Sequence, residues 1–128
     1  MIEHRNFNDV VADDPAPYSN VVLDETHVYL AGLVAADLID GAEVMGDAGA
    51  EAKAVMDAVG ALLRHVGLTY SDIVRVDIHL SNLDDMPVVN AVYEGYFAGT
   101  SYPARTTVEA ARLVENSRVE ITVMARRC

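Results

Sequence analysis

Cysteine is almost absent from this 128-residue sequence, because the only one is the final residue, Cys128. A single cysteine cannot form an internal disulfide, a Cys-x-x-Cys redox pair or a cysteine zinc site. A chain of this length with 52% hydrophobic residues can bury a sizeable core without such cross-links. We therefore predict one domain over residues 1–128, in a reducing compartment.

Long apolar runs and basic charge are also scarce. No window approaches the roughly 18 apolar residues of a membrane span, and the N-terminal residues lack the pattern of a signal peptide. The net charge is −11, from 20 acidic and 9 basic residues, and such a surface repels phosphate backbones and anionic membranes. We predict a soluble, cytoplasmic protein that binds neither nucleic acid nor membranes, although a recessed arginine can still bind a small anion.

Several common catalytic motifs are missing. The sequence has no Gly-x-Gly-x-x-Gly, no Walker loop and no Gly-x-Ser-x-Gly elbow. Its histidines follow neither His-x-His nor His-Glu-x-x-His spacing, and they are His4, His27, His65 and His79. We therefore predict no bound metal.

The hydrophobic pattern predicts two helices and about six strands. One helix runs from Asp47 to Val66, and a second begins near Asp84 and closes at Gly99. The second helix has an apolar stripe made of Met86, Val89, Tyr93 and Phe97. Strands are predicted at Ile2–Arg5, Asn20–Leu23, His27–Ala31, Ile73–Leu80, Ala104–Ala111 and Arg118–Ala125. This content favours an α+β two-layer sandwich, with both helices on one face of the sheet and a polar second face that suits a subunit interface.

The segment Tyr102–Val108 is the most informative part of the chain for function. Pro103 leads the chain into a predicted strand, and the small Ala104 leaves room beside Arg105. A guanidinium can hold a carboxylate through two parallel hydrogen bonds. The residues alone leave two interpretations open: a carboxylate-binding arginine, or a surface arginine paired with one of the acidic residues.

Five segments carry a resemblance that covers nearly the whole chain. In order they are Pro17-Tyr18-Ser19, Val28–Gly32, Asn90–Phe97, Pro103-Ala104-Arg105 and Val119-Glu120-Ile121. Together they resemble the RidA family, also called YjgF or reactive intermediate deaminases. The resemblance implies a chorismate-mutase-like fold with a mixed sheet, a homotrimer and three clefts between subunits.

The resemblance also implies an activity and a set of site residues. The family hydrolyses 2-imino acids such as 2-iminopropionate, and the enamines that tautomerise to them, to 2-oxo acids and ammonia without a cofactor. Arg105 is similar to the family's carboxylate anchor, and Glu120 to the acid that positions or activates water. Ligand-binding roles are implied for Tyr18, Gly32, Asn90 and Thr107.

The expected pairing of the last two strands constrains how Arg105 and Glu120 can meet. If Ala104–Ala111 and Arg118–Ala125 form a simple hairpin, Glu120 lies roughly 13 Å along the strand from Arg105. Contact within one chain is then not expected. Either the register of these two strands differs from that of a simple hairpin, or a subunit interface brings the side chains of Arg105 and Glu120 together.

Three positions depart from the usual family pattern. Ala31 and Leu33 stand where serine and glutamine are usual, and Thr107 where cysteine is common. If these residues line the pocket, we expect a preference for imines with larger apolar side chains. The departures also leave open a different function, that of a non-catalytic trimer that binds or senses a small carboxylate.

An endoribonuclease, an activity attributed to some relatives, is a third interpretation. It requires a basic track along the protein surface, which the net charge of −11 disfavours. The residues that could form a local basic patch are Arg112, Arg118, Arg126 and Arg127.

Overall fold

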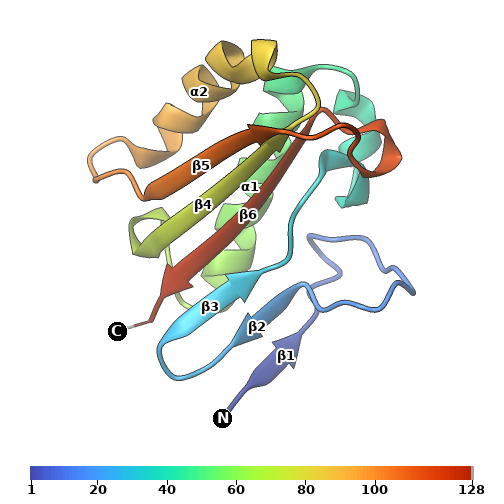
Figure 1. The fold of residues 1–128 in the computed structure, drawn as a ribbon. Helices are drawn as coiled ribbons and strands as arrows, with labels where there is room; N and C mark the ends of the chain where they lie inside the picture. Colours follow the sequence, from blue (N-terminus) through green and yellow to red (C-terminus); the bar gives the residue numbers. More distant parts are fainter. Residues whose placement is uncertain (128) are drawn as a thin grey trace.

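The computed structural model describes residues 1–127, in which two helices cover one face of a six-stranded sheet (Figure 1). The strands are β1 (Glu3–Arg5), β2 (Val21–Leu23), β3 (His27–Leu30), β4 (Ile73–Leu80), β5 (Ala104–Glu109) and β6 (Val119–Arg126). The helices are α1 (Ala48–His65) and α2 (Met86–Glu94), and short 3-10 turns occupy parts of the connections. The predicted α+β two-layer architecture is confirmed. Neither helix is long and apolar enough to cross a membrane.

Local signals in the sequence explain both ends of α1. The side chain of Asp47 accepts a hydrogen bond from the backbone N–H of Ala50 at 3.0 Å, which caps the first turn. Gly67 follows the last turn with a φ of +80°, a left-handed conformation that favours glycine. The apolar face between these ends is buried against the sheet. The helix therefore forms within the bounds that its apolar spacing predicts.

The strand order is β1-β2-β3-β6-β4-β5, and it corrects one prediction. The last two strands do not form a hairpin, because β5 pairs in parallel with β4 while β6 lies between β3 and β4. Helix α2 provides the crossover connection that a parallel pair requires. The apolar face of β6 is fully buried at the centre of the sheet, whereas the more polar β5 forms an edge.

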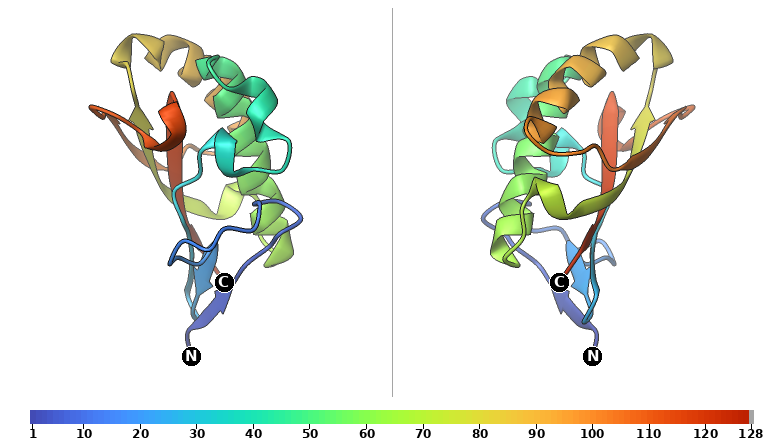
Figure 2. Two further views of the ribbon diagram at one scale, coloured as in Figure 1. Left: turned by 90° about the vertical axis from the view of Figure 1, so that its right-hand side faces the viewer. Right: turned by 90° about the vertical axis from the view of Figure 1, so that its left-hand side faces the viewer.

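The two faces of the sheet differ in chemistry. The helix-covered face contributes the core, with Val76, Ile78 and Leu80 of β4 and Val119, Ile121 and Val123 of β6 at most 2% exposed. Figure 2 shows the sheet nearly edge-on, with both helices on one side. The opposite face, called the uncovered face below, carries polar side chains that include Asp77, His79, Glu120 and Thr122.

Candidate functional site

Arg105 lies on the helix-covered side of the edge strand β5. Its cross-strand partner is Val76, a core residue of β4, so both side chains extend toward the helix layer. The guanidinium carbon Cζ of Arg105 lies 4.9 Å from the centroid of the Tyr93 ring on α2. Within residues 1–127, no carboxylate forms an ion pair with Arg105. Its charge is therefore available to an anionic ligand.

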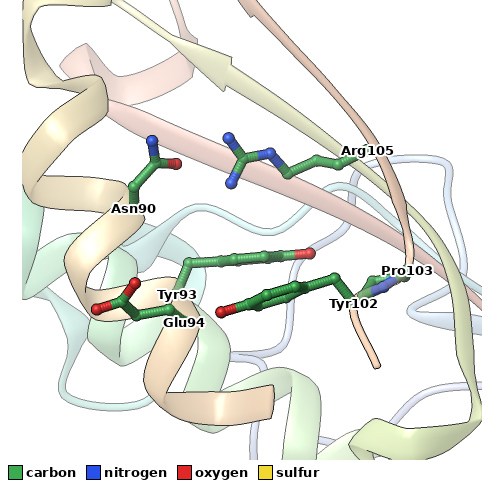
Figure 3. Close-up of a pocket in the computed structure, with 6 residues that line it drawn as sticks. All are labelled: Asn90, Tyr93, Glu94, Tyr102, Pro103 and Arg105. Carbon is green, nitrogen blue, oxygen red and sulfur yellow. The ribbon is translucent and has the colours of Figure 1, made fainter. Parts of the chain in front are cut away.

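The guanidinium borders a cavity of about 350 Å³ between β5 and α2. The cavity is lined by Asn90, Tyr93, Glu94, Tyr102, Pro103 and Arg105. Figure 3 shows the Asn90 amide and the Arg105 guanidinium pointing toward one another. A volume of this size is within the range of small-molecule sites, so two of the predicted site residues share a cavity large enough for a small acid.

Three polar atoms around Arg105 are buried without a hydrogen-bond partner in the described part of the chain. They are the amide oxygen of Asn90, the hydroxyl of Tyr93 and the hydroxyl of Thr107. Burial raises the pKa of Tyr93 to about 12, although the positive charge of Arg105 opposes this rise. Buried polar atoms are usually paired, so the Asn90 amide and the Thr107 hydroxyl are available to a ligand beside Arg105.

Tyr18 and Gly32 lie together at a second depression, of about 400 Å³. Asp37 and Glu115 are also among its lining residues. Glu120 is adjacent, because a Cβ atom added to Gly32 would lie 3.1 Å from the carboxyl carbon of Glu120. The absence of a side chain at Gly32 thus keeps the space beside the Glu120 carboxylate open.

This second group of residues is strongly acidic. Burial, followed by repulsion from Glu115, raises the pKa of Asp37 to about 6. Asp14 and Glu120 raise it further through their negative charges. Burial and the charge of Asp37 also raise the pKa of Tyr18. The negative charges of these carboxylates repel an anion. This second group of residues therefore does not form a site for a carboxylate ligand by itself.

The predicted site residues therefore fall into two groups. Arg105 and Asn90 share the first cavity, with Thr107 two residues further along the same side of β5. Tyr18, Gly32 and Glu120 form the second group, and Glu120 is on the uncovered face. One chain does not bring the two groups together. The cause is not the distance along a hairpin that the sequence predicts. Instead, β4 separates the strands of Arg105 and Glu120, and the two side chains extend to opposite faces of the sheet.

Tyr93 and Tyr102 contribute to the first cavity, yet the sequence does not identify them as site residues. The apolar spacing of the second helix assigns Tyr93 only to its buried stripe. The position of Tyr93 three residues after Asn90 is an available signal, since residues three apart lie on the same face of a helix. Asp37 is not identified either, because its neighbours Glu115 and Glu120 are distant in the sequence.

Leu33 does not contribute to either group. Its side chain is 2% exposed and belongs to the core, and its backbone pairs with Ile121. The expected preference for larger apolar substrates therefore finds no support at this position. Ala31 does line the second depression, where its methyl group replaces the usual hydroxyl.

The four arginines proposed as a local basic patch are divided between the two ends of β6. Arg112 and Arg118 line a depression near its start, whereas Arg126 and Arg127 lie at its other end. Eight strand residues separate these ends by roughly 25 Å. Arg118 is also within 3.6 Å of the Asp85 carboxylate. These arginines do not form one continuous patch for a polyanion.

Comparisons with known proteins identify the family. A family model described as Endoribonuclease L-PSP matches residues 11–127. A Bos taurus protein named 2-iminobutanoate/2-iminopropanoate deaminase is 34% identical over 109 residues, which cover 85% of this chain and 79% of that protein. The crystal structure of the Escherichia coli YjgF gene product matches with a TM-score of 0.89 and 30% identity, over 98% of this chain and 99% of that one. Escherichia coli TdcF with bound serine has a TM-score of 0.89 and 25% identity, over 98% and 100% of the two chains. The predicted resemblance is confirmed, and the chain belongs to the RidA family, also called YjgF.

Proposed function

We propose that this protein hydrolyses reactive 2-imino acids and their enamine tautomers to 2-oxo acids and ammonia. The observation that carries the proposal is the half-buried guanidinium of Arg105, which lies at a cavity without an acidic partner in residues 1–127. The name of the Bos taurus relative supports the reaction class. The serine bound to TdcF supports a small ligand that carries a carboxylate.

In this proposal the complete site forms between two subunits of a homotrimer. One subunit supplies Arg105 with Asn90 and Thr107, and its neighbour supplies Glu120 with Tyr18 and Gly32. The division of these residues between opposite faces of the sheet supports this arrangement, since no rotation of side chains within one chain could join them. The polar uncovered face is the surface that we propose as the subunit interface.

The proposed chemistry needs an anchored substrate and a positioned water. Arg105 holds the substrate carboxylate in a two-point hydrogen bond, which fixes the C=N carbon in the cleft. Glu120 accepts a proton from water while the water oxygen attacks that carbon and the C=N electron pair moves to nitrogen. The nitrogen then takes up two protons, one from Glu120 and one from the hydroxyl group formed by the attack, and the C–N bond breaks as the C=O bond forms. Imine and water are consumed, and 2-oxo acid and ammonia are released, with no cofactor involved.

Trapping of free imine tests the proposal. An amino-acid oxidase generates 2-iminopropionate and 2-imino-4-methylpentanoate, and semicarbazide converts whatever imine remains to a semicarbazone. We expect wild type to suppress semicarbazone formation and Arg105→Ala to lose this effect. Arg5→Ala is the control, because Arg5 pairs with Glu3 on the surface. Equal suppression by wild type and Arg105→Ala would refute the role of Arg105.

The alternative is a trimer that binds a small carboxylate without catalysis. The methyl group of Ala31 in the second depression favours it, because a hydroxyl that could orient water is lost there. Both functions use Arg105, so turnover distinguishes them. Saturable binding of pyruvate together with no suppression of the semicarbazone would support this alternative.

A further inference from the structure

We propose that Tyr93 is the positioning residue for Arg105, and that its ring fixes the orientation in which the guanidinium receives a carboxylate. The effect on turnover rests on the proposed function. The effect on Arg105 itself does not, because it can be measured in the protein without substrate. Tyr93 acts through Arg105 and is not assigned a catalytic role.

The geometry around the Tyr93 ring is that of a fixed platform. Tyr93 is 4% exposed, and its ring packs against Phe97 with centroids 4.8 Å apart. The ring of Tyr102 stacks on it at 6.5 Å with an interplanar angle of 15°. Figure 3 shows Arg105 and Tyr102 on opposite sides of the Tyr93 ring. The ring is therefore held by the core, while the long arginine side chain lies on its other face.

This contact restricts how Arg105 can bind a ligand. The guanidinium carbon of Arg105 lies over the Tyr93 ring, 4.9 Å from its centroid. Figure 3 shows the edge formed by the two terminal nitrogens of the guanidinium directed toward Asn90. A two-point hydrogen bond to a carboxylate uses this edge. Attraction between the cation and the ring, together with reduced freedom of the side chain, favours the receptive orientation before a ligand arrives.

The ring and the hydroxyl of Tyr93 can be tested separately. The hydroxyl is buried and has no hydrogen-bond partner within residues 1–127, so it does not hold the residue in place. Tyr93→Phe removes the hydroxyl and keeps the platform, whereas Tyr93→Leu removes the platform. Tyr96→Leu is the matched control, because Tyr96 belongs to the same aromatic cluster but does not line the cavity of Arg105.

The first measurement is the NMR signal of the Arg105 Nε–H group, assigned by its loss in Arg105→Lys. A group on the face of an aromatic ring is shifted upfield by the ring current. We expect this shift in wild type, Tyr93→Phe and Tyr96→Leu, and its loss in folded Tyr93→Leu. An unshifted signal in wild type overturns the proposal even if Tyr93→Leu does not fold, and so does an unchanged shift in Tyr93→Leu.

The second measurement is binding of pyruvate, followed by turnover of 2-iminopropionate. Loss of the platform should weaken pyruvate binding by about tenfold and raise KM far more than it lowers kcat. Tyr93→Phe should restore binding to within about threefold of wild type. If wild type binds pyruvate but does not hydrolyse the imine, while Tyr93→Leu loses the ring-current shift and the affinity, the proposed function fails and the positioning role stands. If wild type hydrolyses the imine while Tyr93→Leu keeps its shift and affinity, only the positioning role fails.

Discussion

Arg105 and Glu120 extend from opposite faces of one sheet, with β4 between their strands. Arg105 is aligned with Val76 on the helix-covered face, whereas Glu120 is aligned with His79 on the uncovered face. Neither side chain can reach through a sheet whose strands are hydrogen-bonded throughout. If both residues act on one substrate, they must come from two copies of the chain.

Oligomers assembled from two different inactive variants should therefore recover imine hydrolysis. Arg105→Ala and Glu120→Gln are each expected to lose imine hydrolysis, because each damages one half of every site. In the proposed homotrimer, random assembly of equal amounts of the two variants gives both intact halves at about a quarter of the sites. We expect about that fraction of wild-type activity, in a species with three times the 13.8 kDa mass of the chain. A mixture as inactive as its components would contradict a shared site.

Gly32→Ala should reduce turnover while the protein stays folded. The new Cβ would lie 3.0 Å from the Thr122 hydroxyl and 3.1 Å from the carboxyl carbon of Glu120. The Glu120 carboxylate must then shift, and a misplaced general base costs about 10- to 100-fold in kcat. Gly95→Ala is the control, because nothing lies within 4 Å of its added Cβ. Steady-state kinetics and thermal unfolding of both variants separate a local effect from a loss of structure.

Asp37→Asn should stabilise the protein at neutral pH. Burial and the nearby carboxylate of Glu115 raise the pKa of Asp37 from 3.8 to about 6, so between these values the folded state binds more protons than the unfolded state. Stability from this group is therefore greatest at low pH and declines as pH rises from about 4 through 6. Asparagine removes the repulsion, which we expect to add about 1 kcal/mol at pH 7.5 after allowance for screening by water.

Urea unfolding at pH 4.5 and pH 7.5 checks this prediction. The difference between Asp37→Asn and wild type should be small at pH 4.5 and larger at pH 7.5. Asp13→Asn, in the exposed N-terminal loop, controls for the general effect of removing one negative charge. A gain that is equal at both pH values would show that repulsion at Asp37 is not its cause.

Glu51→Ala should strongly destabilise the fold. Glu51 is fully buried in the first turn of α1, and its carboxylate accepts backbone N–H groups from Gly46 and Arg118, both at 2.8 Å. Alanine leaves these two partly buried N–H donors without their charged acceptor, which costs about 2–4 kcal/mol. Glu51→Gln keeps one acceptor oxygen and should cost less. Chemical unfolding of the two variants measures the difference, and equal losses would assign the effect to packing alone.

Local order in this protein follows from the sequence by itself. Helix α1 has an apolar stripe, an Asp47 cap and Gly67 after its end, and all three depend on residues only a few positions apart. The alternation of buried and partly exposed residues along β6 is equally local. The RidA resemblance rests on short segments of this kind. For these reasons the order of amino acids is enough to predict the helices, the strands and the family.

Only the tertiary structure decided which strands are neighbours and which side chains share a cavity. Strand pairing joins residues far apart in the chain, and a regular alternation does not specify which edge a strand will occupy. The placement of β5 beside β4 put Arg105 over Tyr93 and away from Glu120. The burial of Leu33 and the crowding of Asp37 by Glu115 depend on the same long-range packing. The sequence therefore indicated the reactive groups, whereas the packing of the sheet determined how they are distributed between its two faces.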